Sequence, residues 1–281
     1  MLSNLKISPH DLIGCSFYGY HIEVLVEHND VTGIFVSQKQ GEYYIIKLAL
    51  AQDAIPLIEH EERIIQNINH WGVVSFISRI DINGFPALVL HRYTRGVLAQ
   101  YIGLLSIEEI SNIFSRLCEV CDFLREHDIF HRDIKPDNIA LDNGGVPVLI
   151  DFGMSCCTGK QEEYFTGTLD YAAPEVLKGE KVTYDSELYS IASVVYALIH
   201  GIPPSKDHAL RTSHGLSVQE DAKLNRMLNL EPSSRREKKR QVNLRQSLKK
   251  EKVKQSTNLY IFMCIVLIFL LWFSITLLLP M

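Results

Sequence analysis

The chain has 281 residues, of which 47% are hydrophobic and 22% are charged, so it is long enough for one or two domains with a real core. Residues 235–254 contain ten Lys or Arg and two acidic residues, a net charge of +8; the other 18 basic and 31 acidic residues, net −13, all precede this run. An acidic body of this size argues against nucleic acid as the main partner.

The first part of the chain reads as a β-sheet. The stretch "YHIEVLV" from Tyr20 alternates apolar and polar residues, and the strand-like stretches "GIFVSQ" and "EYYIIKLAL" follow, joined as a hairpin by the turn at 39–41. Residues 55–70 predict a helix with Ile58, Ile65 and Ile68 on one face. Two more strands are expected around the turn Asn83-Gly84, for a sheet of about five strands.

After Ser106 the pattern becomes mainly helical. Ser106 and Glu109 have the spacing of a capping box at the start of a long helix that extends to about residue 127. Short strands are expected near 139–141 and 148–150, and helices from there to about Leu248. A sheet-rich part followed by a helical part predicts an α+β, two-lobed molecule with a ligand cleft between the lobes.

The six cysteines do not indicate a metal site or a disulfide framework. Cys118 and Cys121 form a C-x-x-C pair, but the pair lies inside an apolar-periodic helix and no second pair completes a metal site. We therefore expect both to be small residues of the core.

The stretch 130–142, "FHRDIKPDNIALD", concentrates chemically useful groups between apolar residues, and "DFG" follows at 151–153. Phosphoryl transfer to a hydroxyl needs a carboxylate to accept the proton, a cation to offset charge on the moving group, and oxygen ligands for Mg²⁺. Asp133 and Lys135 can be the carboxylate and the cation, and Asn138 and Asp151 the metal ligands.

These motifs resemble those of the eukaryotic-type (Hanks-type) Ser/Thr protein kinases, of a bacterial-like kind, with a match from about Tyr20 to Leu248. The resemblance implies an N-lobe at about 20–90 and a C-lobe at about 94–248. It also implies ATP with Mg²⁺ or Mn²⁺ as cofactors. The catalytic residues would be Asp133, Lys135 and Asn138; the nucleotide-binding residues would be Lys47, Glu61, Gly33, His91, Tyr93 and Asp151.

Further positions match the family outside its catalytic loop. Leu90 is at the position of the gatekeeper, the hinge would be 91–93, and Glu175 of "APE" should pair with Arg235. Lysine two residues after the catalytic aspartate, together with Thr168, favours Ser or Thr acceptors in protein substrates. The resemblance therefore implies a protein serine/threonine kinase.

Other positions depart from the family pattern. The family has G-x-G-x-x-G between its first two strands, whereas this chain has "EHNDVTG" at 27–33, and Ile45 replaces a small alanine. Glu187 replaces an aspartate that braces the catalytic loop, and the segment 206–222 is short for the family's substrate-docking helix.

Three functions remain open at this point. An active kinase is favoured; a pseudokinase that serves as a binding scaffold is the main alternative, and a small-molecule phosphotransferase is the third. For an active kinase, either phosphorylation of Thr166 or the standing charge of Glu162 and Glu163 would order the segment beside Arg132.

The tail predicts a membrane anchor. Residues 259–279 are 21 residues without a charge, enough for a helix of roughly 30 Å, and a basic linker precedes them at 249–258. We expect a single-pass protein with a cytoplasmic kinase domain, at the plasma or inner membrane in a bacterium, whose linker contacts anionic lipid. Homodimerisation through the anchor or the kinase domain is left open.

Overall fold

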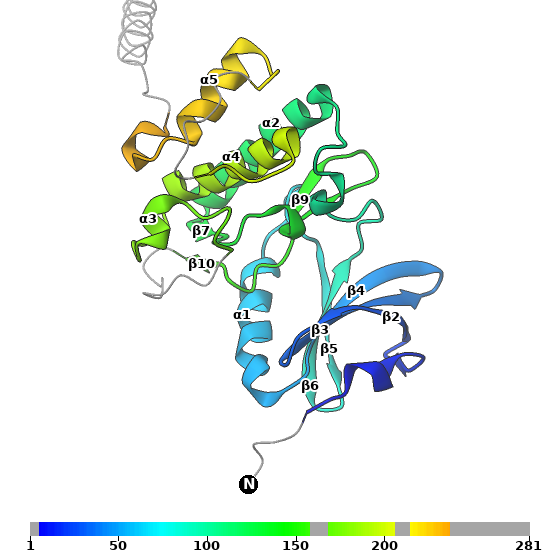
Figure 1. Ribbon diagram of the computed structural model, residues 1–281. Helices are drawn as coiled ribbons and strands as arrows, with labels where there is room; N and C mark the ends of the chain where they lie inside the picture. The colour runs from blue at the N-terminus through cyan, green and yellow to red at the C-terminus, as the bar shows by residue number, and fades with distance from the viewer. Residues whose placement is uncertain (1–5, 158–167, 206–213, 237–281) are drawn as a thin grey trace, which may run out of the picture. The chain divides into compact units, whose positions relative to one another are not determined.

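The computed structural model describes residues 6–157, 168–205 and 214–236, which all belong to one compact unit (Figure 1). Its first lobe is a six-stranded antiparallel sheet in the order β1-β2-β3-β4-β6-β5. The strands are β1 (Ser16–Phe17), β2 (Tyr20–His28), β3 (Thr32–Lys39), β4 (Glu42–Ala49), β5 (Phe76–Ile82) and β6 (Phe85–His91). The sheet predicted from the alternating pattern is thus confirmed, with β1 as one extra short strand.

Two tight turns set the register of this sheet. Lys39 pairs with Glu42 across Gln40 and Gly41, and Ile82 pairs with Phe85 across Asn83 and Gly84. All four turn residues have positive φ, between 54° and 89°, which is the geometry of a two-residue hairpin and suits Asn and Gly. Both hairpins were predicted from the sequence.

The sheet also includes residues that precede the predicted start of the domain at 20. Ser16 and Phe17 pair with His21 and Tyr20, and further upstream Lys6 bridges to Ala51. The first lobe therefore begins well before β2.

Helix α1 (Ile55–Ile65) packs against this sheet and buries Ile58, Glu61, Ile64 and Ile65. It is five residues shorter than predicted. Ile68 still packs against the core, but its amide donates to Ile65 O, a tighter bond than an α-helix makes, so the apolar spacing continues after the helix has ended.

The second lobe is built on three capped helices. They are α2 (Ile107–Glu126), α4 (Tyr184–His200) and α5 (Val218–Met227), with the short α3 (Pro174–Leu177) between the first two. Each long helix begins with a capping box, formed at α2 by Ser106 and Glu109 as predicted. Of the segment 206–222, residues 206–213 lie outside the described residues and 218–222 open α5.

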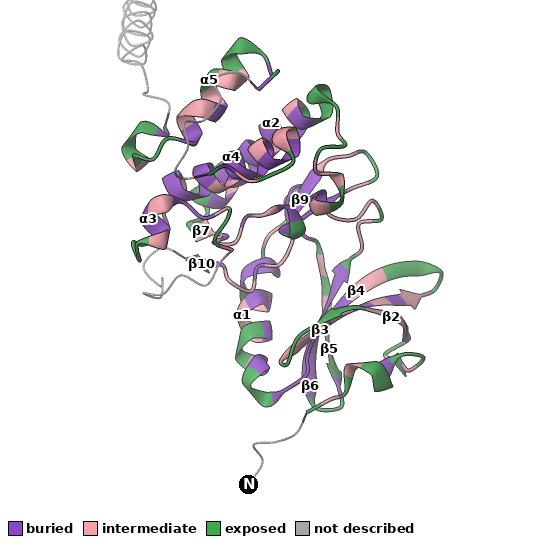
Figure 2. Ribbon diagram, in the orientation of Figure 1, coloured by how far each residue is buried: buried purple, intermediate pink, exposed green. Residues whose placement is uncertain are grey.

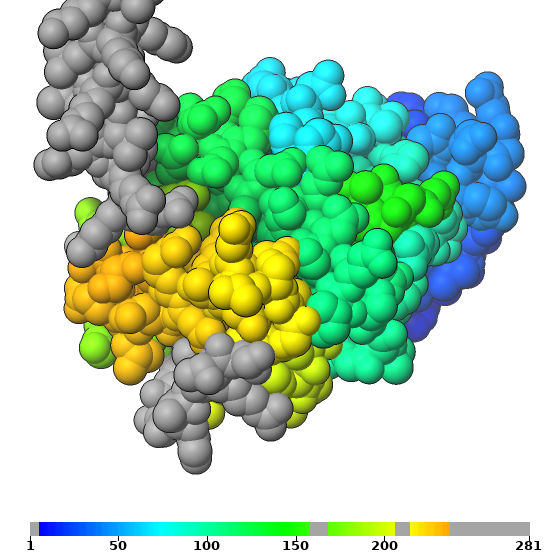
Figure 3. Space-filling model, turned by 90° about the horizontal axis from the view of Figure 1, so that it is seen from above, coloured from blue at the N-terminus to red at the C-terminus, as the bar shows by residue number. Residues whose placement is uncertain are grey.

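Helix α5 lies directly beside α2, as the adjoining yellow and green surfaces of Figure 3 show. Ser111 donates to the Glu220 carboxylate, and the Lys223 ammonium lies 4.9 Å from the centre of the Phe114 ring. Helix α4 is the most buried of the helices (Figure 2), and Cys118 and Cys121 of α2 are buried in the core as predicted.

Short strands and turns lie between the two lobes' main elements. Strands β7 (Ile129–Phe130) and β10 (Cys156–Cys157) form one pair, and β8 (Ile139–Leu141) and β9 (Pro147–Leu149) form another. Five 3₁₀ turns complete the described structure: Pro9–Leu12, Gln52–Ala54, Leu98–Tyr101, Pro136–Asn138 and Pro232–Ser234.

The predicted linker 249–258 and anchor 259–279 lie outside the described residues. Within residues 6–157, 168–205 and 214–236, no helix combines the length and the apolar character that crossing a membrane requires.

A close approach at Gly72 joins the first lobe to α2 and β9. The Gly72 carbonyl accepts from Leu149 N at 2.8 Å, and a Cβ on Gly72 would overlap Val120 Cγ2. We predict that Gly72→Ala lowers the free energy of unfolding by about 1–3 kcal/mol, measured by urea denaturation. Because the cause is contact with Val120, adding Val120→Ala should give a combined loss smaller than the sum of the single losses; strict additivity would contradict the explanation.

Candidate active site

Lys47 joins three elements of the molecule at one point. Its ammonium on β4 lies 2.6 Å from Glu61 Oε2 on α1 and 2.7 Å from Asp151 Oδ1, just after β9. The other oxygen of Glu61 accepts from Phe152 N at 3.1 Å. Three residues that the sequence placed far apart, Lys47, Glu61 and Asp151, are thus brought together.

Lys47 and the two carboxylates shift one another's pKa values. Burial alone would lower the pKa of Lys47, but the carboxylates of Glu61 and Asp151 outweigh burial and raise it above its ordinary value. Burial alone would raise the pKa of Asp151, but Lys47 outweighs it and lowers the pKa to about 2. At neutral pH the site therefore holds an ammonium beside an ionised Asp151.

Asp133 is the centre of a second polar group. Its Oδ1 accepts from Thr168 N at 2.9 Å and from Thr168 Oγ1 at 3.1 Å, and its Oδ2 accepts from Asn138 Nδ2 at 2.8 Å. The Lys135 ammonium lies 2.9 Å from Asp133 Oδ2 and donates to Thr168 Oγ1 at 2.9 Å. The predicted catalytic residues therefore contact one another directly.

The main chain of Ile150 connects the two groups. Its amide donates to Asn138 O at 2.9 Å, and its carbonyl accepts from His131 Nε2 at 3.0 Å. Burial lowers the pKa of His131, so this ring is neutral, with its proton on the nitrogen that donates. Asp151, the next residue, has a φ of 60°. This left-handed conformation is unfavourable for a residue other than glycine, and the surrounding hydrogen bonds stabilise it.

The donor set fits a hard cation such as Mg²⁺. Nδ2 of Asn138 donates to both the carbonyl and the carboxylate of Asp133, which orients the amide and leaves Oδ1 for a ligand. On Asp151, Oδ1 is used by Lys47 and by Gly153 N, while Oδ2 has no bond to another described residue. One amide oxygen and one carboxylate oxygen are thus available, as such cations prefer.

A cavity of about 200 Å³ lies beside Lys47 and Asp151. Cross-strand pairing places Glu27, Ile34, Lys47 and Leu88 in one row on the same face of the sheet. The next row on that face is apolar and consists of Val24, Val36, Ile45 and Leu90. An apolar surface for a flat ring and a charged surface for phosphates therefore lie next to each other.

Three of the predicted nucleotide-binding residues are not among the described residues that line this cavity. His91 pairs with Tyr44 on the opposite face of the sheet from Leu90, and with Tyr93 it lines a different cavity of about 380 Å³. Gly33 pairs with Leu48 in the ladder, and a Cβ there would come within 2.9 Å of the Phe35 ring. The local packing thus accounts for Gly33 without a nucleotide.

A family model described as "Protein kinase domain" matches residues 32–264. The match covers most of the chain, including the lysine, the catalytic loop and the "DFG" segment. The chain belongs to the protein kinase family.

Curated relatives of this kinase match it over shorter stretches, and all three below are from Dictyostelium discoideum. A probable myosin light chain kinase is 31% identical over 60% of this chain and 50% of its own length. The probable serine/threonine-protein kinase gdt4 is 32% identical over 53% of this chain and 10% of its own. The dual specificity protein kinase zak2 is 40% identical over 34% of this chain and 16% of its own. The chain thus aligns with half or less of each relative.

Glu187 braces the catalytic loop of the kinase from below. Its two carboxylate oxygens accept from His131 N at 3.0 Å and from Arg132 N at 2.9 Å. The longer side chain thus still reaches the loop. Burial raises its pKa from 4.5 to about 7, although both amides favour the ionised form.

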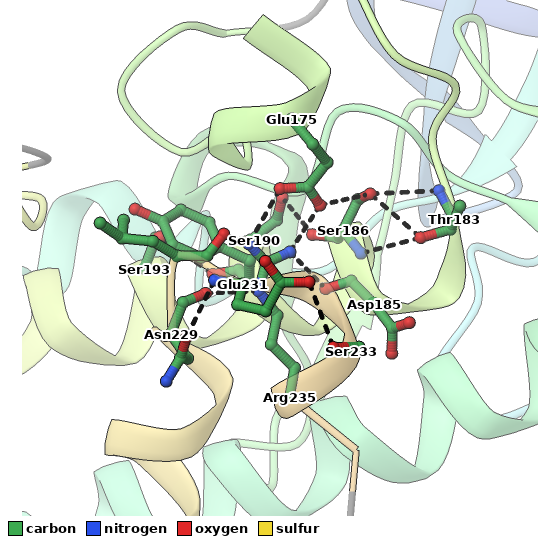
Figure 4. A network of polar contacts seen from close by, with 12 residues as sticks. Glu175, Thr183, Asp185, Ser186, Ser190, Ser193, Asn229, Glu231, Ser233 and Arg235 are labelled. Atoms are coloured by element: carbon green, nitrogen blue, oxygen red, sulfur yellow. Dashed lines mark hydrogen bonds and ion pairs between the residues drawn. The ribbon is translucent and has the colours of Figure 1, made fainter. Parts of the chain in front are cut away.

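The predicted pair of Glu175 and Arg235 is present and almost fully buried (Figure 4). The guanidinium makes two bonds to the carboxylate, of 2.5 and 2.9 Å, and it also donates to the carbonyls of Asp185, Asn229 and Leu230. Ser186 adds a hydrogen bond to Glu175. This network fixes α3, the N-terminus of α4 and the turn after α5 together.

One contact beside the site was missed from the sequence. The ring of His60 on α1 donates from Nε2 to Ser155 O at 2.6 Å, next to the bond between Glu61 and Phe152. No motif marks this histidine, because its partner is a main-chain carbonyl. Thr166, Glu162 and Glu163, proposed to act on Arg132, lie outside the described residues.

We predict that the stability contributed by Glu187 depends on pH. Because its folded-state pKa is raised to about 7, the folded protein binds this proton more tightly than the unfolded chain. The resulting stabilisation is fully present below pH 4.5 and is lost as the pH rises through about 7. The free energy of unfolding of the wild type, minus that of Glu187→Gln, should therefore fall by a few kcal/mol from pH 4.5 to 7.5 in urea titrations.

Activity should change in the opposite direction. Protonated Glu187 loses an acceptor for one of the two loop amides, so kcat should rise with pH through about 7 in the wild type. Glu187→Gln should lack this rise and stay low. A stability difference that does not change with pH would show that Glu187 is ionised throughout.

Proposed function

We propose that this chain is a serine/threonine protein kinase that transfers the γ-phosphoryl group of ATP to protein hydroxyls. The observation that carries the proposal is the contact of Lys47 with both Glu61 and Asp151 at the wall of one cavity. In an unrelated polar core a buried lysine would need only one partner. Here Asp151, on a third element of the fold, adds a second carboxylate, and its Oδ2 is available for a ligand.

Each residue has a role that its contacts support. Lys47 binds the α- and β-phosphates, and Glu61 keeps its ammonium in place. Asp133 orients the acceptor hydroxyl and takes its proton, while Lys135 offsets negative charge on the transferred group. Because Thr168 donates twice to Asp133 Oδ1, the carboxylate is held in one orientation before a substrate arrives.

Asn138 and Asp151 would hold Mg²⁺ or Mn²⁺ through their free oxygens. When bound, the cation neutralises phosphate charge and orients the triphosphate. The site residues themselves then supply proton acceptance and positioning.

Serine and threonine acceptors are favoured by the contacts of Lys135 and Thr168 around Asp133. One relative is named a serine/threonine-protein kinase and another a dual specificity protein kinase, so acceptor identity must be measured. A catalytically silent scaffold is the second candidate. It is favoured by the absence of a glycine-rich turn between the described β2 and β3, and by Glu27, whose row includes Lys47.

We predict that the purified full chain transfers label from γ-labelled ATP to itself or to a general protein substrate, on Ser or Thr. Asp133→Asn keeps the size of the side chain but cannot accept the proton, so the rate should fall by roughly 10²- to 10⁴-fold. Phosphoamino-acid analysis gives the acceptor type. Label transfer that Asp133→Asn leaves unchanged would point to a contaminating kinase, and ATP binding without transfer would support the scaffold.

The kinase is further proposed to be tethered to a membrane, with its catalytic domain in the cytoplasm. The support is the sequence of the tail, an uncharged 21-residue segment preceded by a basic linker. Dimerisation through the tail or the kinase domain would follow naturally from such a tether and is part of the proposal.

We predict that the full chain floats with vesicles of phosphatidylcholine and phosphatidylserine in a density gradient, even in 1 M salt. A chain ending at residue 258 should bind such vesicles only at low salt, through its basic linker. A full chain that stays at the bottom of the gradient without detergent would exclude the anchor.

A further inference from the structure

The turn between β2 and β3 forms part of the cavity wall beside Lys47, and it is built around Asn29. The Asn29 amide donates to Thr32 O at 3.0 Å, which closes the turn. Asn29 Oδ1 accepts from Val31 N at 2.9 Å, from Thr32 N at 2.8 Å and from Thr32 Oγ1 at 3.2 Å. Three main-chain amides of the turn are therefore used within the turn itself.

A second set of bonds ties this turn to the sheet. Leu50 N donates to Val31 O at 2.7 Å, and Leu50 O accepts from Ile7 N at 2.9 Å. The ladder also continues up to the pair His28 and Gly33, so only four residues lie between paired positions. Such a short turn, bonded on both sides, has only the Asp30 amide left to offer to a triphosphate.

The bonds to Asn29 determine how its side chain is oriented. Because Val31 N, Thr32 N and the Thr32 hydroxyl approach one atom of the carboxamide, that atom is the oxygen. The carboxamide is planar, so Nδ2 is directed away from these donors. Its two N–H groups make no bond to any residue in the described part of the chain, and Asn29 lines the cavity that Lys47 and Asp151 share.

Charge around the cavity makes a neutral donor valuable at this place. Among the described residues that line the cavity, Lys47 is the single lysine or arginine, and both Glu61 and Asp151 contact it. Glu27, in the same row of the sheet as Lys47, adds a further carboxylate. A triphosphate entering here needs more hydrogen-bond donors than the single amide, that of Asp30, that the turn has left.

We propose that the side-chain amide of Asn29 binds the phosphates of the nucleotide, in place of the main-chain amides of a glycine-rich loop. The inference rests on the proposed function, because it takes ATP as the ligand. Three bonds to Oδ1 hold the donor in position before binding, which lowers the entropy cost of using a side chain.

The test compares binding of Mg-ATP and of adenosine to the full chain by titration calorimetry. Asn29→Asp keeps an oxygen for the three turn bonds but replaces the donor with a negative oxygen. We expect a 10- to 100-fold rise in the Kd for Mg-ATP and little change for adenosine, which has no phosphates. Asn29→Ser, which keeps an acceptor and adds no charge, should give a smaller rise of the same kind.

Asn83→Asp is the matched control, since it makes the same change in another hairpin of the same sheet and should leave both Kd values unchanged. Equal Mg-ATP affinity in the wild type and Asn29→Asp, with ATP bound by both, would overturn the role of Asn29 alone. A wild type that binds neither ligand would overturn the proposed function and this inference with it. Loss of adenosine binding in Asn29→Asp would show that this variant damages the first lobe, and Asn29→Ser would then decide. In Asn29→Ser, unchanged affinity for Mg-ATP would refute the proposal. A raised Kd for Mg-ATP with an unchanged Kd for adenosine would support it.

Discussion

The arrangement of the site depends on one buried ammonium. Lys47 is 9% exposed and contacts two carboxylates from different parts of the chain, so removing it would leave the buried Glu61 and the adjacent Asp151 without a counterion. Helix α1 can therefore not move away from the sheet without exposing or isolating Glu61. The bond to Lys47 also fixes the direction of the Asp151 side chain. The bond from Phe152 N to Glu61 fixes the path of the main chain after β9.

The second lobe uses buried carboxylates in a related way. Glu187 receives two main-chain amides of the catalytic loop, and Glu175 receives the Arg235 guanidinium. In both cases a charged group on or before α4 is satisfied by a loop distant in sequence. The catalytic loop and the turn after α5 are thus tied by charged groups to α4 and α3.

Much of this could be predicted from the sequence, because the determining features are local or belong to recognisable motifs. Alternation and turn residues predicted the strands around Asn83, and capping residues predicted α2. Catalytic motifs predicted which groups would meet at Asp133. The early end of α1 could not be predicted, because apolar spacing persists through Ile68 after the helical hydrogen bonds stop. The contact of His60 escaped prediction for another reason: its partner is a main-chain carbonyl that any residue could supply.

The amide and the carbonyl of Ile150 link the two polar groups, and the Ile150 side chain takes no part in this link. A substitution at this position can therefore keep both hydrogen bonds of the link, and its direct effect is on the core against which Ile150 packs. Relatives of this protein could therefore vary the side chain at position 150 within the limits that core packing sets, without disturbing the ligands for a cation.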